Sequence, residues 1–327
     1  MKRIKFSIVA FICFFSFCVI LFLVIKSCSQ AGVDQEDNTP DESLTNVTGD
    51  VVSDEYIFSD PLSNYVLKDE ENNLIVKELD VEGDNRVFQV GNVKFTMVYV
   101  EGGSFKMGAT EEQGSDAEKD EKPVHNVTLS DYYIGETEVT HILWNVVISP
   151  DVYITCWPYR GHYNPVEDCS YEDCKYFIDK LNELFSGKLN GMKFAMPTEA
   201  QWEYAARGGK YSRGYKYSGS NNIDDVAWYS DNARTIDRGT HPVARKQPNE
   251  LGLYDMSGNV GEWCSDWYGR YSSNSQTNPK GPKRETHHVQ RGGYFYDEDE
   301  YCRVSSRQEG YLMSFRDYFG FRLVLVP

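Results

Sequence analysis

The sequence predicts one α+β domain with short strands, short helices and long loops, which follows an N-terminal segment of different character. Residues 76–107 alternate apolar and polar side chains between turn residues, a pattern typical of short antiparallel strands. Two later segments carry helix-start signals. From Gly208 onward, Gly, Asn, Asp and Ser recur every few residues among frequent Trp and Tyr. Regular structure in that half must therefore be short.

The N-terminal segment is of the type that directs a chain to a membrane. Three basic residues within the first five precede an uncharged, mostly apolar run over residues 6–25, about the ~20 residues that a bilayer-spanning helix needs. Two interpretations stay open for residues 1–28: a retained membrane anchor, or a lipoprotein signal that ends at a lipid-accepting Cys28. Both predict a membrane-anchored chain whose remainder is periplasmic or at the cell surface.

Residues 29–72 predict an acidic, disordered tether. From residue 28 to residue 66 there is no Lys or Arg, so the stretch cannot bury enough apolar surface to offset its chain entropy. The formal net charge of −17 also excludes nucleic acid as a partner, because phosphate contacts need clustered Lys and Arg.

The folded part is expected to begin with a short β segment over residues 73–94 and to continue as one domain over residues 95–327. Helices are predicted over residues 137–148 and after two capping boxes, Ser170 with Asp173 and Thr198 with Gln201. The helix after Ser170 has one apolar stripe at helical spacing, made of Cys174, Phe177, Ile178, Leu181, Leu184 and Phe185.

Several segments occur in the order found in one known family. They are residues 100–108 (VEGGSFKMG), 123–125 (PVH), 135–140 (GETEVT), 197–209 (PTEAQWEYAARGG), 252–263 (GLYDMSGNVGEW), 291–293 (RGG) and 320–323 (GFRL). The chain thus resembles the formylglycine-generating-enzyme, or sulfatase-modifying factor, domain family (FGE-sulfatase). The resemblance implies an α+β, C-type-lectin-like fold with little regular secondary structure.

The resemblance also implies an altered reactive centre. Active members oxidise a substrate cysteine to formylglycine with oxygen and Cu(I), which two cysteine thiolates hold. Counting from the Arg-Gly-Gly stretch places Asp297 at the first cysteine and Cys302 at the second. A carboxylate is a poor ligand for soft Cu(I) and cannot form a mixed disulfide. We therefore expect no copper site and interpret the chain as a non-catalytic member.

Calcium is a further expectation from the resemblance. Family members bind it through a loop that corresponds here to Asp255, Gly258, Val260 and Glu262, with two carboxylates and two backbone carbonyls. Oxygen ligands of this kind suit a hard cation. The alternative is that Asp255 and Glu262 only bond the backbone.

Disulfides are expected if the chain is exported. The family fold brings together the segments that contain Cys264 and Cys302, so these two are the expected pair. A second bridge from Cys156 to Cys169 or Cys174 stays open.

The stretch after the Arg-Gly-Gly motif is rich in Tyr, Ser, Asp and Arg, a composition typical of binding surfaces. The expected ligand face contains Tyr294, Tyr296, Asp297, Asp299, Tyr301, Tyr311 and Tyr318. Two functions stay open. One is a binding or scaffold module for an unknown protein or glycan on an extracytoplasmic surface. The other is an enzyme, either a formylglycine generator or a related non-haem iron oxygenase, although the histidines show no metal-ligand spacing.

Overall fold

The computed structural model describes residues 65–148, 161–233, 239–310 and 318–327. The predicted anchor over residues 1–28 with its Cys28, most of the predicted tether, Cys156 and Tyr311 lie outside these residues. Within them, no helix has both the length and the apolar character needed to cross a membrane.

A six-stranded sheet with the order β1-β2-β3-β6-β13-β7 forms the base of the domain. β1 (Val76–Leu79), β2 (Arg86–Val90) and β3 (Val93–Val100) form an antiparallel meander. Gly83 and Gly91, in the turns between them, have positive φ, as the turn residues in the sequence indicate. The alternation of side chains in this region therefore correctly predicts the strands.

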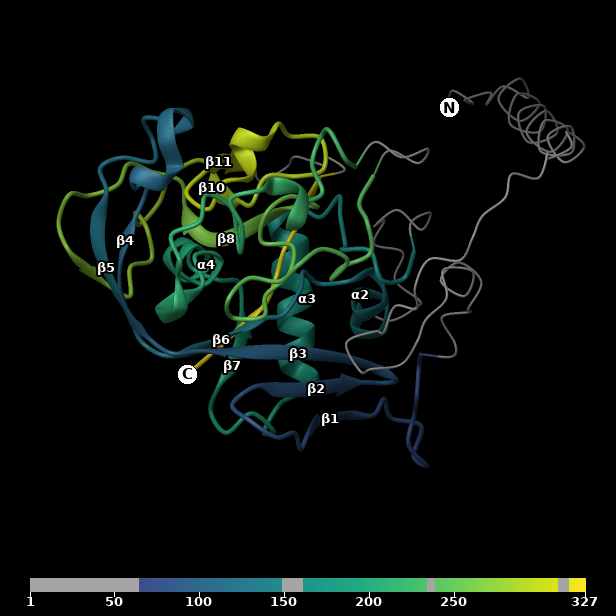
Figure 1. Cartoon of the computed structure of the whole chain (residues 1–327). Helices are drawn as coiled ribbons and strands as arrows, with labels where there is room; N and C mark the ends of the chain where they lie inside the picture. The colour runs from purple at the N-terminus through teal and green to yellow at the C-terminus, as the bar shows by residue number, and fades with distance from the viewer. Residues whose placement is uncertain (1–64, 149–160, 234–238, 311–317) are drawn as a thin grey trace, which may run out of the picture. The chain divides into compact units, whose positions relative to one another are not determined.

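The other half of this sheet joins segments that are distant in sequence. β6 (Tyr132–Gly135) pairs with β3, and β13 (Val324–Val326) lies between β6 and β7 (Lys193–Ala195). All these pairings are antiparallel. In Figure 1 the C-terminus accordingly lies beside β6 and β7, next to the strands of the N-terminal half.

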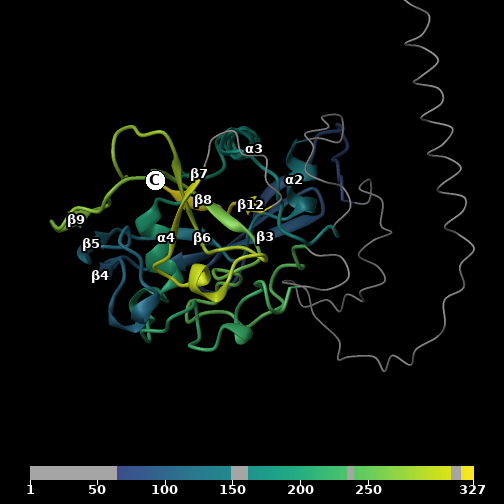
Figure 2. The same ribbon diagram turned by 90° about the horizontal axis from the view of Figure 1, so that it is seen from above.

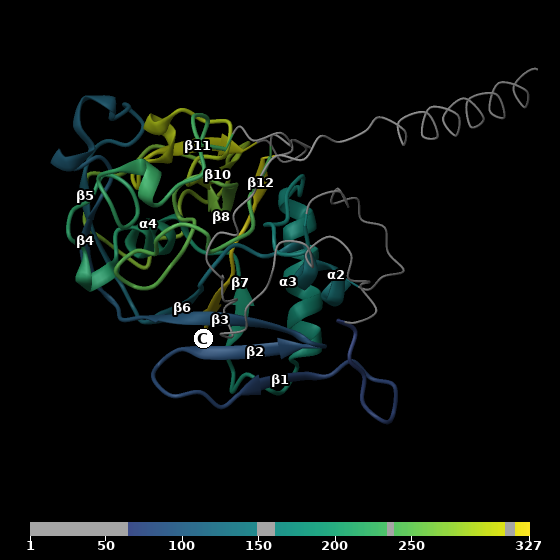
Figure 3. The same cartoon turned by 45° about the vertical axis from the view of Figure 1, so that its right-hand side comes forward.

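Two helices, α2 (His141–Ile148) and α3 (Tyr171–Leu184), lie side by side on one face of the sheet (Figure 3). The predicted capping box of α3 is confirmed, since the Ser170 hydroxyl accepts from the Asp173 N–H and the Asp173 carboxylate accepts from the Ser170 N–H. α2 begins four residues later than predicted. The Val139 N–H donates to the Phe321 carbonyl at 2.9 Å, which holds this segment out of the helix.

Aromatic rings fill the space between α2, α3 and the sheet. Trp144 of α2 stacks on Phe177 of α3, with centroids 5.1 Å apart. Phe88 of β2 packs edge-on against Phe185 and Phe194. The apolar stripe of α3 is thus in the core, and its Cys174 is fully buried.

The opposite face of the sheet carries α4 (Glu199–Ala206), whose capping box between Thr198 and Gln201 is also confirmed. Beside it lies a three-stranded sheet of β4 (Gly103–Met107), β5 (His125–Leu129) and β9 (Gln276–Thr277), which Figure 2 shows at one side of the domain. A second apolar cluster lies here, in which the Trp202 side chain of α4 is fully buried.

A four-stranded sheet with the order β11-β10-β8-β12 positions the candidate site. β8 (Gly261–Trp267), β10 (His288–Arg291) and β11 (Arg307–Gly310) are antiparallel, whereas β12 (Phe319–Gly320) runs parallel to β8. Short 3₁₀ turns η4 to η7 complete the elements: Glu111–Asp116, Gly209–Tyr211, Ile223–Asp225 and Asp299–Cys302. The mixed helix and sheet class predicted from the sequence is confirmed.

Candidate functional site

Asp297, at the predicted reactive position, lies in the loop between β10 and η7. Its Oδ2 accepts from the Gln308 Nε2 at 3.0 Å and from the Tyr294 N–H at 3.2 Å. Its carbonyl accepts from the Ser230 N–H at 3.0 Å. Burial raises the pKa of Asp297 to about 6, although the hydrogen bonds from Gln308 and Tyr294 act in the opposite direction. The carboxylate is thus fixed in place and takes up a proton near pH 6.

Cys302, the second predicted position, ends η7 and is fully buried. Burial raises the pKa of its thiol well above the usual value, and the charge of Asp297 adds to the effect. The thiolate is the form of cysteine that attacks substrates and binds metals. At neutral pH Cys302 is therefore a protonated thiol without that reactivity.

The expected disulfide between Cys264 and Cys302 is not formed, and both thiols are free and buried. Cys264 packs in the cluster that contains Trp202, whereas Cys302 packs in a separate small cluster with Tyr217 and Val226. The strand β8 and the turn η7 thus direct these two side chains into different apolar clusters.

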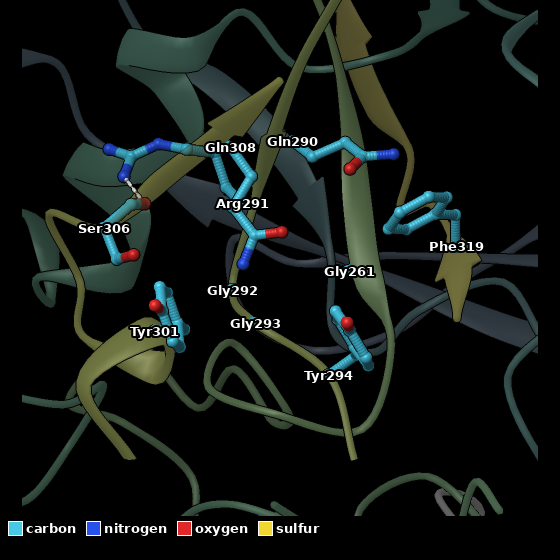
Figure 4. Close-up of a pocket in the computed structure, with 10 residues that line it drawn as sticks. All are labelled: Gly261, Gln290, Arg291, Gly292, Gly293, Tyr294, Tyr301, Ser306, Gln308 and Phe319. Carbon is cyan, nitrogen blue, oxygen red and sulfur yellow. Dashed lines mark hydrogen bonds between the residues drawn. The ribbon is translucent and has the colours of Figure 1, made fainter. Parts of the chain in front are cut away.

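A small hollow lies over the face of the four-stranded sheet, and Figure 4 shows it with its lining side chains. We call it the Gln290 hollow. It is a shallow packing gap without room for a water molecule, and it is lined by Gly261, Gln290, Arg291, Gly292, Gly293, Tyr294, Tyr301, Ser306, Gln308 and Phe319. Three of the lining residues are glycines, and the rings of Tyr294, Tyr301 and Phe319 stand around it.

Gln290 is the unusual side chain of this hollow. It is 2% exposed, and neither its Oε1 nor its Nε2 has a hydrogen-bond partner within the described residues. Gln308 lies directly across from it on β11 and bonds Asp297 instead. Because an unpaired buried amide costs about 1–3 kcal/mol, such a group needs an explanation.

Only part of the predicted ligand face lines this hollow. Tyr294 and Tyr301 belong to its wall, and Asp297 reaches it through Gln308. Tyr318 stacks on Tyr294 at 4.6 Å, and the 40% exposed Tyr296 lies 5.8 Å from Tyr318. Asp299, in contrast, is turned away, since it accepts from the Tyr217 hydroxyl at 2.8 Å.

The loop expected to bind calcium is built around a buried ion pair. Glu262 is fully buried, and both of its oxygens accept from Arg322, at 2.6 and 2.7 Å. Its Oε2 also accepts from the Trp202 Nε1 at 2.7 Å. Arg322 further donates to the carbonyls of Gly135 and Tyr254 at 3.0 Å, so the guanidinium is closely held.

The remaining predicted ligands do not complete a cation site. The Asp255 Oδ2 accepts from the Ala244 N–H at 2.7 Å, and its Oδ1 has no partner among the described residues. Gly258 is required by its close approach, because a Cβ there would lie 2.2 Å from the Trp228 carbonyl oxygen. Val260 is fully buried.

A third buried acid, Glu138, also faces this charge cluster, and its pKa is raised well above the usual value by burial and by the charge of Asp255. No group of three or more His, Cys, Asp or Glu side chains in the described part of the chain is arranged to hold a metal ion. The residues as placed do not fit calcium, since Arg322 already supplies the positive charge next to Glu262. The calcium implied by the resemblance is therefore not expected in this arrangement, and melting curves in calcium and in a chelator test this.

Sequence reasoning missed Gln290, Gln308 and the role of Arg322. Gln290 directly precedes the Arg-Gly-Gly motif and Arg322 lies within the Gly-Phe-Arg-Leu motif, so both segments were identified without their side-chain roles. No local pattern marks a glutamine as unpaired, because that depends on partners from other strands.

Most of the folded part is similar to known proteins. Residues 88–326 match the model of the sulfatase-modifying factor enzyme 1-like domain. "Chaperone protein LppX" of Paenibacillus barcinonensis is 36% identical over 241 residues, which cover 60% of this chain and 77% of that protein. The formylglycine-generating enzyme of Streptomyces coelicolor is 29% identical over 287 residues, which cover 69% of this chain and 87% of the enzyme.

Among solved structures, Treponema denticola variable protein 1 superimposes with a TM-score of 0.63 at 29% identity, over 75% of this chain and all of that one. The region that matches the family model contains β3 to β13, α2 to α4, the Gln290 hollow and the Glu262–Arg322 pair, whereas β1 precedes it. The chain belongs to the sulfatase-modifying factor enzyme 1-like domain family.

Proposed function

We propose that this chain is an exported, membrane-anchored binding module whose C-type-lectin-like domain does not generate formylglycine. The observation that carries the proposal is the state of the two predicted reactive positions. Asp297 is a carboxylate fixed by Gln308 and the backbone, and Cys302 is a buried thiol with a raised pKa.

These two side chains do not fit a copper centre. Cu(I) is bound by soft thiolate ligands, and here one ligand would be a hard carboxylate and the other a thiol that burial keeps protonated. The fixed position of Asp297 serves a different purpose, since it orients Gln308 at the edge of the hollow.

The relatives support both classes of function. The protein from Paenibacillus barcinonensis has the name of a chaperone, and chaperones act by binding. The relative from Streptomyces coelicolor is named for formylglycine generation, which keeps the enzyme as the second candidate. The environments of Asp297 and Cys302 support the binding class.

The enzymatic alternative is tested on the full chain, purified in detergent. We expect it to leave a sulfatase-type cysteine peptide unmodified in the presence of Cu(I) and oxygen, as judged by the mass loss that marks formylglycine. The Streptomyces coelicolor enzyme serves as the positive control. Turnover by the wild-type chain that Cys302→Ser abolishes would overturn the proposal.

The membrane part is tested by cell fractionation. The full chain should be recovered with membranes, and a chain that begins at residue 69 should be recovered in the soluble fraction. Metabolic labelling with a fatty acid, compared between wild type and Cys28→Ser, separates a lipidated cysteine from a retained helix. Recovery of the full chain in the cytosol would contradict the anchoring.

A further inference from the structure

We propose that an open acidic pocket beside η5, here called the η5 pocket, binds a linear aliphatic polyamine whose ammonium groups pair with several separate carboxylates. This inference rests on the proposed function as a binding module and names its ligand class. Three features carry it: a space with room for a ligand, acidic groups without partners around that space, and a lysine of the chain that already places an ammonium group there.

The η5 pocket has room for a small molecule. Its volume is about 280 Å³, close to the lower end of the ~300–1,000 Å³ that is usual for ligand sites. It lies between the turn that joins β1 to β2, the strand β3, and η5 with residues 250–251. Most of its lining residues are exposed, so a ligand can enter without any movement of the fold.

The turn between β1 and β2 forms one wall of the pocket and carries two acids, Glu82 and Asp84. It is fixed to β3, because the Tyr99 N–H donates to the Asn85 Oδ1 at 3.0 Å. Residues 82–85 precede the segment that matches the family model. The family match therefore does not account for this wall.

The acidic groups of the lining outnumber the basic ones by four to one, since Lys210 is the single base. Glu82 and Asp84 make no ion pair within the described part of the chain. Glu250 accepts from the Arg213 N–H at 3.1 Å through Oε1, whereas its Oε2 is buried without a hydrogen-bond partner among the described residues. The Arg213 side chain itself is exposed and outside the lining. A cationic ligand would give these carboxylates the charge that the chain does not supply.

Lys210 shows how the pocket holds an ammonium group. Its Nζ forms an ion pair with Glu101 and lies 5.1 Å from the centre of the Tyr211 ring, which is within the range of a cation–π contact. The two side chains of the ion pair are 39% and 50% exposed, so the pair is weak and another cation can replace Lys210. An ammonium group of a ligand would then have the same two partners.

The placement of the acids favours an extended cation over a metal ion. A metal ion needs ligands that converge on one point, and no group of three or more His, Cys, Asp or Glu side chains does so in the residues that the structure describes. The acids of the pocket instead come from three segments: the turn at residues 82–84, Glu101 after β3, and Glu250. A linear polyamine separates its ammonium groups by several methylenes and can therefore reach more than one of these segments.

Apolar and aromatic surface between the acids suits the methylene groups of such a ligand. The lining includes the buried Val98 and the partly buried Leu251. Tyr211 is 58% exposed, and Tyr99 is held by a hydrogen bond from its hydroxyl to Asp131 at 2.8 Å. Alkyl chains that end in an ammonium group pack against apolar surface while the charge stays solvated. A hydrated metal ion would gain nothing from this surface.

The test uses isothermal titration calorimetry on the full chain in detergent at low salt, with spermidine as the probe. Butylamine, with one ammonium group on a similar chain, is the matched probe, and trilysine represents a basic protein segment. We expect spermidine to bind, and butylamine to bind about tenfold more weakly, because fewer ion pairs form. The affinity for spermidine should fall as salt is added, since exposed ion pairs are screened.

Charge-neutralising variants locate the binding. Asp84→Asn and Glu250→Gln, on different walls of the pocket, should each weaken spermidine binding about threefold. Glu172→Gln, at an exposed acid of α3 outside the pocket, changes the net charge equally and should leave binding unchanged. Lys210→Gln removes the internal competitor and should strengthen binding about threefold, an increase that a folding defect does not produce.

Absence of spermidine binding would overturn the inference, as would a loss of affinity in Glu172→Gln equal to that in Asp84→Asn and Glu250→Gln. Tighter binding of trilysine than of spermidine would also overturn it and would point to a basic protein segment as the ligand. These failures are distinct from failure of the binding-module proposal, which is read from turnover of the cysteine peptide.

Discussion

Two neighbouring strands of one sheet each carry a buried polar side chain, and the two side chains differ in their hydrogen bonding. On β8, Glu262 has every oxygen bonded, to Arg322 and Trp202. On β10, Gln290 has neither amide atom bonded within the described residues. The two strands are paired, with Arg291 opposite Glu262 and Gln290 opposite Trp263. Glu262 and Gln290 are therefore one position apart in the register of the sheet.

The difference separates a fully paired buried polar group from an unpaired one. Glu262 is as deeply buried as a side chain can be, and the cost of burying its charge is offset by a bidentate partner. Gln290 is equally buried but its hydrogen-bonding capacity is unused, in the wall of a hollow. Burial alone would have ranked the two as equals. The hydrogen-bond partners distinguish them.

The largest effect is expected from breaking the ion pair of Glu262 on β8. Arg322→Met leaves Glu262 without its counter-charge beside Asp255 and Glu138, and it should destabilise the fold by about 3–5 kcal/mol, a loss of roughly 10 °C in Tm. The control is Lys180→Met in the exposed pair with Glu183, which should cost less than about 0.5 kcal/mol. Similar losses for the two variants would contradict the structural role of Arg322.

The next effect concerns the pH dependence of stability that Asp297, the partner of Gln308, causes. Burial raises the pKa of Asp297 to about 6 in the folded protein, above the ordinary aspartate value of 3.8. Between these values the folded state keeps a proton that the unfolded chain releases, so stability is present below pH 4 and is lost as pH rises through 6. Between pH 4.5 and pH 7.5 this lowers the free energy of unfolding of the wild type by roughly 2 kcal/mol, and Asp297→Asn should remove that pH dependence. Urea melts at pH 4.5 and pH 7.5 measure it, and parallel wild-type and variant curves would contradict the assignment.

A smaller effect distinguishes the two glutamines. Gln290→Met removes an unpaired amide and should stabilise the protein by about 1 kcal/mol. Gln308→Met removes the bond to Asp297 and should destabilise it by about 1 kcal/mol. The pair differs only in whether a partner is lost, and thermal melts compare them directly. Equal destabilisation by both would mean that Gln290 is satisfied in the free protein.

The smallest effect is expected from calcium. A filled site at a hundred times its dissociation constant would stabilise the fold by about 2.7 kcal/mol, but Arg322 occupies the carboxylate that a cation needs. We expect Tm to be the same in calcium and in a chelator. An increase of several degrees that Glu262→Ala abolishes would show that calcium displaces the guanidinium.

The elements of this fold that depend on local pattern could be predicted from the sequence. Alternation and turn residues predict β1 to β3, and the capping boxes predict α3 and α4, because caps and periodicity act within a few residues. The start of α2 was misplaced because a bond from Val139 to the distant Phe321 competes with the helix. Tertiary contacts of this kind leave no local signal.

The candidate site could be predicted only in part for the same reason. The resemblance located Asp297 and Cys302, and the structure supplies their protonation and burial. Predicting the bridge from Cys264 to Cys302 requires the directions of both side chains, and these do not follow from two segments being close together. Arg322 lies sixty residues from Glu262, so their pairing depends on the packing of the finished fold.

The position of β13 has a consequence for how the protein is made. Val324–Val326 is inserted between β6 and β7 in the large sheet, so β7 has no other strand to pair with until these last residues arrive. Contacts between such distant segments are slow to form. A growing chain can form the β1–β3 meander early, but it cannot close the sheet until residues 324–326 have been synthesised. Closure of the sheet therefore depends on residues 324–326, and an intermediate that lacks them leaves one edge of β6 without a paired strand.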